Sequence, residues 1–230
     1  MNFIRQRTPS LTMVVLVLLG IVLLQEEITY STTFGRLEHL IRGPEADTGI
    51  LAVGWSVVRT LSIVAVAGLW ILNRKPPLFK AIVGVNGLLT VGLLLNVIAL
   101  TEFVFRLTPR AVEMLLVDVL LLAVSNILIF SIWYWIIDPP GVEETPRHED
   151  PWDFLFPQRG GELPNYESWQ PKYTDYLYLA FTTSFAFSPT DTLPLTRRAK
   201  VLMMVQSVIS VVTLTGIVGG AIGMLAGSGV

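Results

Sequence analysis

The sequence alternates between long apolar runs and shorter polar connections. A hydrocarbon core of about 30 Å is crossed by about 20 apolar residues in a helix. Unsatisfied backbone amides are costly in lipid, so a crossing segment of this length has to be helical. Five segments qualify: Thr8–Leu24, Leu51–Leu72, Ala81–Leu100, Val112–Ile137 and Ala199 to about Ala226. The pattern therefore predicts an all-α integral membrane protein with about five transmembrane helices.

The first apolar run resembles a signal peptide, because Arg5 and Arg7 precede it. A signal peptide also needs small residues at a cleavage site. Here the polar residues Gln25, Glu26 and Glu27 follow instead. We therefore expect an uncleaved first helix that ends near Leu24.

A segment between the fourth and fifth runs, Tyr173–Pro189, is too short and too polar to cross a bilayer. Thr174 or Asp175 can cap a helix that continues to Ser184. About eleven residues at 1.5 Å each give a helix of roughly 16 Å, half a bilayer. A hydroxyl-rich stretch and the charged "TDTLPLTRRAK" follow. This order predicts a re-entrant half-helix, which must be buried in protein or line a water-filled cavity.

The polar connections divide the chain into three parts. Residues 1–138 form a four-helix transmembrane region, and residues 173–230 hold the hairpin and the last helix. Between them, residues 139–172 form an extramembrane loop rich in proline, acidic and aromatic residues. Wholly disordered segments rarely keep so many aromatic side chains. We therefore expect part of the loop, notably "PWDFLFPQ", to fold against the membrane face.

Composition narrows the function further. Charged residues make up 15% of the chain, against roughly 25% in soluble domains. No basic domain face is visible, so nucleic acid is not an expected partner. The chain has no cysteine and two histidines, and it shows no HExxH, GxSxG or P-loop pattern. We expect neither an enzyme, nor a cofactor, nor a metal site, and the lipid bilayer is the first partner.

The order helix, loop, half-helix, polar return and helix resembles tetrameric cation channels. "FTTSFAFSPTDTLPLT" is similar to their pore-loop signature, in which a Thr-Thr pair ends the pore helix. Potassium channels have Gly-Tyr-Gly at the filter, where this chain has Phe-Ala-Phe, so potassium selectivity is not implied. The resemblance implies a tetramer that passes monovalent cations. It also implies a pore loop made of Thr182 and Thr183 at the entrance, Ser184, Phe185, Ala186, Phe187 and Ser188 in the return strand, and Asp191 at the exit.

A second resemblance covers about the last 100 residues. "DFLFPQ" followed by "DYLYLAFTTSFAFSPTDTLPLTRRAKVLMMVQS" is similar to an uncharacterised group of bacterial integral membrane proteins. That likeness implies the fold and a bacterial cytoplasmic membrane, and it carries no established activity.

The last helix places Gln206, Ser210 and Thr213 at i, i+4 and i+7, so they share one face. In a channel this face would be the pore-lining stripe. Alternatively, the hydroxyls bond the carbonyls four residues back and need no water. Glycines at four-residue spacing further on favour close helix packing.

Arg59 lies inside the second helix, where an unpaired charge is costly. Asp118 is at a similar depth in the fourth helix, which runs in the same direction. We therefore predict an intramembrane ion pair between Arg59 and Asp118.

Two functions from different classes follow. The leading hypothesis is a channel-like pore-loop protein that passes cations with weak selectivity, as a homo-oligomer. The alternative is a non-conducting membrane scaffold or accessory subunit that binds a partner protein. Most Lys and Arg residues lie on the N-terminal side, which predicts a cytoplasmic N-terminus and a hairpin that enters from that side.

Overall fold

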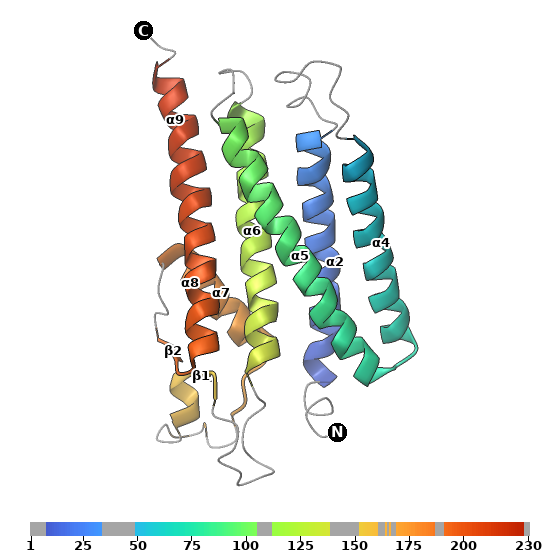
Figure 1. Ribbon diagram of the computed structural model, residues 1–230. Helices are drawn as coiled ribbons and strands as arrows, with labels where there is room; N and C mark the ends of the chain where they lie inside the picture. Colours follow the sequence, from blue (N-terminus) through green and yellow to red (C-terminus); the bar gives the residue numbers. More distant parts are fainter. Residues whose placement is uncertain are drawn as a thin grey trace.

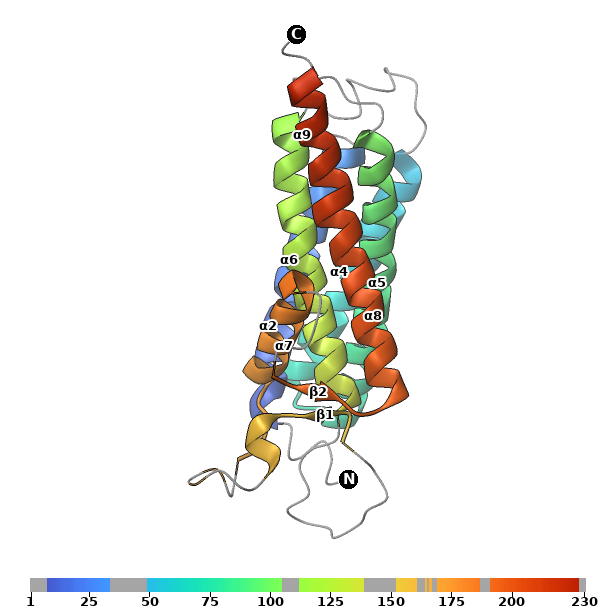
Figure 2. The same ribbon diagram turned by 90° about the vertical axis from the view of Figure 1, so that its left-hand side faces the viewer.

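The computed structural model describes residues 8–33, 49–104, 112–138, 152–160, 164, 166, 169–186 and 191–227. It is an all-α bundle whose long helices lie side by side (Figures 1 and 2). Within the described ranges, five helices are long and apolar enough to cross a membrane. These are α2 (Thr8–Thr33), α4 (Gly49–Ile71), α5 (Lys75–Val104), α6 (Val112–Ile137) and the last helix, made of α8 (Arg197–Val211), a π-helical turn (Val212–Ile217) and α9 (Val218–Gly227).

The first helix is longer than its apolar run predicts. It continues past Leu24 to Thr33, because polar side chains in its last turns have partners on neighbouring helices. Gln25 is fully buried and donates to the carbonyl of Leu89 in α5 at 2.8 Å. The polar sequence after Leu24 is therefore part of the helix.

A tight turn joins α4 to α5. Asn73 has a φ of 52°, and the amides of Asn73 and Arg74 donate back to the carbonyls of Trp70 and Leu69. This is the bonding of a Schellman motif, in which asparagine is one of the few residues that tolerate a left-handed backbone. Prolines then occupy the second and third positions of α5, where few amides would have an intrahelical partner.

Helix α6 is the most buried of the five long helices, and α4 is the least. Helix α6 contacts α2 and α5 on one side and α7 and α8 on the other (Figure 1). Its buried side chains include Leu122, Ile129, Phe130 and Tyr134. The apolar core is therefore built around α6.

The short helix predicted before the last span is confirmed as α7, Tyr173–Ala186. Its 14 residues extend about 21 Å, too short to cross a hydrocarbon core. Before it, β1 (Phe154–Leu155) pairs antiparallel with β2 (Leu193–Pro194), which follows it. Both strands lie at the end of the bundle where α8 begins (Figure 2). The two strands that precede and follow α7 thus pair with each other at one end of the bundle.

Candidate functional site

Hydrogen bonds join the start of α7 to a side chain of α6 and to that of Asp138, which follows α6. At its first turn, the hydroxyls of Tyr173 and Ser131 lie 2.6 Å apart. One turn later, the hydroxyl of Tyr176 donates to Asp138 at 2.6 Å. Asp175 lies in the first turn of α7, where partial burial raises the pKa of its carboxyl group. The backbone amide of Lys172 donates to the Asp175 carboxylate at 2.6 Å, which opposes this rise. The start of α7 is therefore fixed against the end of α6.

Gln206 of α8 joins the other end of α7 to the bundle. Its amide nitrogen donates to the carbonyl of Ala180 and to the hydroxyl of Ser184, both at 2.8 Å. Its amide oxygen accepts a hydrogen bond from the hydroxyl of Tyr134 in α6. Gln206 is fully buried, so three helices meet at one side chain whose polar atoms are all engaged. We call Gln206, Tyr134 and Ser184 the glutamine hub.

Two other pore-loop candidates, Thr182 and Thr183, also form hydrogen bonds within the chain. Thr183 is buried and donates to Leu179 at 2.7 Å, and the half-buried Thr182 donates to the same carbonyl at 3.0 Å. Phe185 and Ala186 are exposed at the end of α7, and Asp191 is exposed before β2. Phe187 and Ser188 lie outside the described residues. Both threonine hydroxyls are used by the helix itself.

The predicted polar stripe of the last helix faces inward. Ser210 accepts a hydrogen bond from Asn126 of α6 at 2.8 Å, and Thr213 donates to Ile209 at 2.7 Å. Like Gln206, both residues are buried. The three residues therefore share one face, as predicted, and that face lies against the interior of their own chain.

The predicted ion pair between Arg59 and Asp118 is corrected. The guanidinium of Arg59 lies 2.9 Å from Glu26 of α2, while Asp118 accepts a hydrogen bond from Ser31 at 2.7 Å. Arg59 also donates to Thr29 at 3.0 Å, and its side chain is fully buried. The prediction ended the first helix at Leu24, which left Glu26 out of reach of the bundle. Because the helix continues, Glu26 is the nearer partner.

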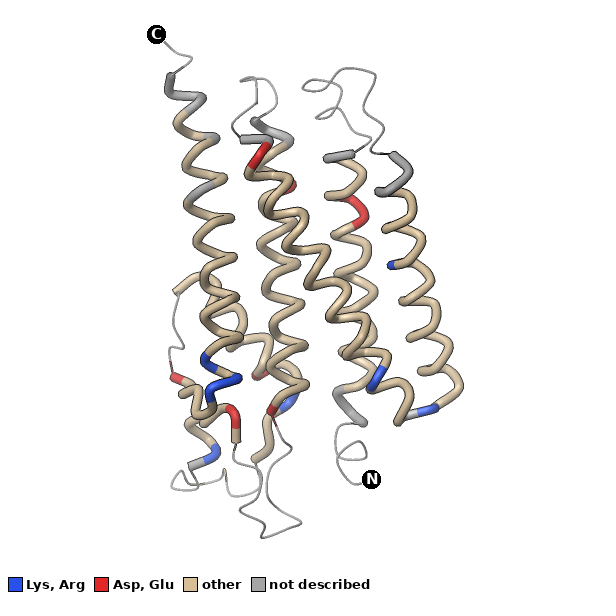
Figure 3. The backbone as a smooth tube through the Cα atoms, in the orientation of Figure 1, with Lys and Arg blue, Asp and Glu red and all other residues tan. Residues whose placement is uncertain are grey.

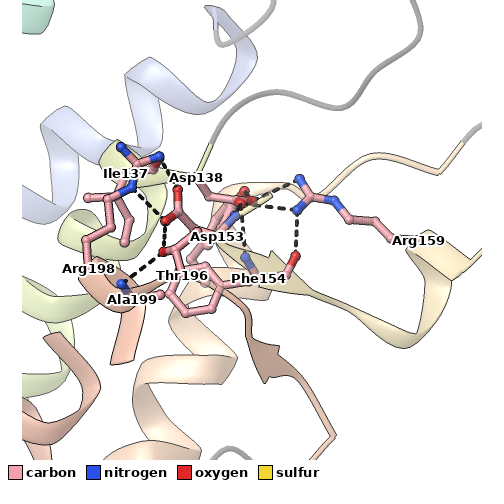
Figure 4. Close-up of polar contacts among 9 residues, drawn as sticks. Ile137, Asp138, Asp153, Phe154, Arg159, Thr196, Arg198 and Ala199 are labelled. Carbon is pink, nitrogen blue, oxygen red and sulfur yellow. Dashed lines mark hydrogen bonds and ion pairs between the residues drawn. The ribbon is translucent and has the colours of Figure 1, made fainter. Parts of the chain in front are cut away.

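Two buried carboxylates, which sequence reasoning did not single out, organise the end of the bundle (Figure 4). Asp138 follows α6 and forms an ion pair with Arg159 at 2.8 Å, with both side chains buried. It also accepts hydrogen bonds from the backbone amides of Asp153 and Phe154 at 3.0 and 3.3 Å. Asp153 and Phe154, within the segment expected to fold against the membrane face, are thereby held to the end of α6.

Asp153 makes the second connection. Its carboxylate pairs with Arg198 of α8 at 2.6 Å and accepts a hydrogen bond from the hydroxyl of Thr196. Thr196 is also the N-cap of α8 and accepts a hydrogen bond from the amide of Ala199. Figure 4 shows Asp138 and Asp153 side by side between the two arginines. We call these four charged residues the carboxylate clamp.

Aromatic rings close the space between the clamp and α7. Phe154 packs edge-on against Tyr134 with ring centres 5.1 Å apart. Phe156 lies 5.6 Å from both Trp169 and Tyr176. Phe154 and Phe156 of the loop therefore belong to the protein core, and Trp169 packs against it. Asp153 was not singled out from the sequence, although a proline-flanked acid within such an aromatic run was a signal that could have identified it.

Nothing in the described ranges resembles a metal centre, since no group of three His, Asp or Glu residues could hold an ion. The described contacts at this site are structural, and they fix α7, the β1–β2 pair and the start of α8.

We expect the glutamine hub to contribute strongly to stability. Gln206→Leu removes one hydrogen-bond partner from each of the buried hydroxyls of Tyr134 and Ser184, and should lower the free energy of unfolding by about 2 kcal/mol. Unfolding of the purified protein in a mild detergent, followed by circular dichroism, measures this loss. The control is Met204→Leu, an outward substitution on the same helix, which should have little effect. Equal stability of the two variants would contradict the role given to Gln206.

Comparisons with protein-family models, with curated proteins and with solved structures found no match to this chain.

Proposed function

We propose that the protein is a non-conducting membrane scaffold or accessory subunit, in which α7 is a packed structural element. In this proposal α7 enters the membrane from one face and the chain returns to that face. The clamped end of the bundle then presents a fixed surface to a partner protein.

The distribution of polarity around α8 carries the proposal. A cation pathway needs carbonyls, hydroxyls or charges along its walls. The side chains of Gln206 and Ser210 in α8 are buried within its own chain, and its outward face carries Val201, Met204, Val208 and Val211. A homo-oligomer assembled on this face would enclose an apolar space. The single chain therefore offers little for a cation to bind.

The carboxylate clamp supports the partner-binding part of the proposal. A surface that is already ordered loses less conformational entropy when a partner binds. The clamp holds β1 and β2 in place, while Leu193 and Leu195 expose 57% and 45% of their surface beside them. Tyr166, in the connection that precedes α7, is also exposed. Exposed apolar side chains on an ordered surface suit a protein partner. We call the surface formed by β1, β2 and Leu195 the platform.

Charge distribution supports an orientation for this platform. Figure 3 shows the described Lys and Arg positions at the end of the bundle that carries the clamp, apart from one in α4. Positive residues favour the cytoplasmic side of a membrane. In this proposal the platform faces the cytoplasm, and the membrane is the bacterial cytoplasmic membrane that the sequence resemblance implies.

A cation-conducting homo-oligomer is the second candidate, and the direction of α7 favours it. The carboxyl end of α7 lies beside the middle of α8, and a helix carries partial negative charge at this end. Phe185 and Ala186 are exposed there, so a neighbouring subunit could reach this end. The tetramer implied by the pore-loop resemblance would place four such ends together.

Ion flux and thiol reactivity distinguish the two candidates. The chain has no cysteine, so Ser184→Cys and Ser210→Cys each introduce a single, nearly isosteric thiol. We expect no cation flux above that of empty liposomes, and no reaction of either thiol with a membrane-impermeant methanethiosulfonate. Arg197→Cys, on an exposed residue, is the control that should react. Flux together with reaction at Ser184→Cys would overturn the scaffold in favour of the channel.

A photo-crosslinker tests the partner surface. Placed at Leu193 in the native membrane, it should yield an adduct with one distinct protein. At Val208, which is exposed on the apolar face of α8, it should yield lipid adducts only. Protein adducts at Val208 and none at Leu193 would move the partner away from the platform.

A further inference from the structure

The outward face of α8 carries two cations at its base, Arg197 and Lys200. Arg197 and Lys200 are three residues apart and exposed, and within the described part of the chain neither forms an ion pair. Arg198, between them in sequence, turns to Asp153 of the clamp. The first turn of α8 contains no acid. Among the described residues, no carboxylate is therefore paired with either of these positive charges.

An apolar strip continues the same face away from these cations. Val201, Met204, Val208 and Val211 lie at i+4, i+7, i+11 and i+14 from Arg197, so helical periodicity puts them above it. Their exposed fractions are 53%, 62%, 62% and 44%. Ten residues of rise make the strip about 15 Å long, the thickness of one hydrocarbon leaflet. In the orientation proposed above, the cations lie where headgroups meet this leaflet.

We propose that this surface, the α8 lipid strip, binds an anionic phospholipid. Arg197 and Lys200 hold the headgroup phosphate, and an acyl chain lies along Val201, Met204 and Val208. Charge complementarity selects the headgroup, because a lipid with net negative charge relieves the repulsion between the two cations. A zwitterionic headgroup brings its own cation and relieves it less. The site goes beyond the scaffold function and does not depend on a protein partner.

The experiment titrates the purified full-length chain in a non-ionic detergent with phosphatidylglycerol, and counts bound lipids by native mass spectrometry. Parallel arms use phosphatidylcholine and inorganic phosphate. We expect phosphatidylglycerol to bind more tightly than phosphatidylcholine, and inorganic phosphate not to compete, because it lacks the acyl chains. Each basic side chain near a membrane surface contributes about 1 kcal/mol, so Arg197→Gln with Lys200→Gln should weaken phosphatidylglycerol binding about 25-fold.

The matched control is Arg74→Gln with Lys80→Gln. These residues are also exposed cations at the same end of the bundle, and their loss changes the net charge equally. We expect this variant to bind phosphatidylglycerol like the original chain. Arg197→Lys with Lys200→Arg should retain binding, which separates loss of charge from loss of fold. Equal losses in both glutamine variants, or equal binding of the two lipids, would overturn the site.

Discussion

Asp138→Asn is expected to loosen the end of the bundle and lower the free energy of unfolding by about 4 kcal/mol. Asp138 has no exposed side-chain surface, and it pairs with Arg159, whose side chain is only 3% exposed. Removing one partner of a buried pair leaves the other charge desolvated without compensation, which costs far more than the pair itself contributes. The asparagine also loses part of its acceptor capacity toward Tyr176 and the amide of Phe154.

Trypsin provides a local readout for this variant. Arg159 is held by Asp138 and by the carbonyl of Phe154, 2.7 Å from its guanidinium, so the peptide bond after it is protected. We expect cleavage after Arg159 in Asp138→Asn under conditions that leave the original chain intact. Asp191→Asn removes an exposed acid from the same end of the bundle and is the control. If both variants resist trypsin equally, the clamp does not fix the loop.

Glu26→Gln is the second substitution with a large expected effect, about 3 kcal/mol of lost stability. The side chain of Arg59 is fully buried, whereas 29% of the Glu26 side chain is exposed. The arginine therefore depends on this carboxylate, because no water reaches it. Its remaining bonds to Thr29 and Gln25 are to neutral groups, which do not balance a charge in a low-dielectric interior.

The neighbouring acid makes a matched control. Glu27→Gln removes the same charge one residue away, from an exposed side chain. Denaturant titration in detergent micelles should show a large shift for Glu26→Gln and almost none for Glu27→Gln. The double variant Glu26→Leu with Arg59→Met should recover much of the lost stability, since it removes both charges. A similar shift for Glu26→Gln and Glu27→Gln would refute the pair.

Length and hydropathy were sufficient to predict the spans and the short helix before the last one. Hydrocarbon thickness fixes how many apolar residues a crossing helix needs, so these elements depend on local sequence alone. The end of the first helix was not predictable in this way. Gln25 and Glu26 stay helical because they bond to α5 and α4, and that information lies in other segments.

The same limit explains the misassigned partner of Arg59. Depth was estimated from helix ends, and the misplaced end of the first helix excluded Glu26 from consideration. Once α2 is extended to Thr33, Glu26 reaches Arg59 and leaves Asp118 with Ser31. The misplaced end of the first helix thus led to the wrong predicted partner for Arg59.

The shared face of Gln206, Ser210 and Thr213 was predictable, because helical periodicity alone determines it. The surroundings of this face were not predictable. Whether a polar face lies against water or against a neighbouring helix depends on how α6 and α7 pack, and no pattern within α8 contains that information. The carboxylate clamp was missed for the same reason, since Asp138, Asp153 and Arg198 come from three separate segments.

The path of the chain around α7 is tested most directly by single thiols on its two flanks. Lys172→Cys and Arg197→Cys, in the cysteine-free chain, are labelled from one side of sealed, oriented vesicles with a membrane-impermeant maleimide. Glu102→Cys, at the far end of α5, marks the opposite side. The account predicts that the first two thiols react from the same side and Glu102→Cys from the other. Reaction of Lys172→Cys and Arg197→Cys from opposite sides would mean that α7 crosses the membrane, and would contradict it.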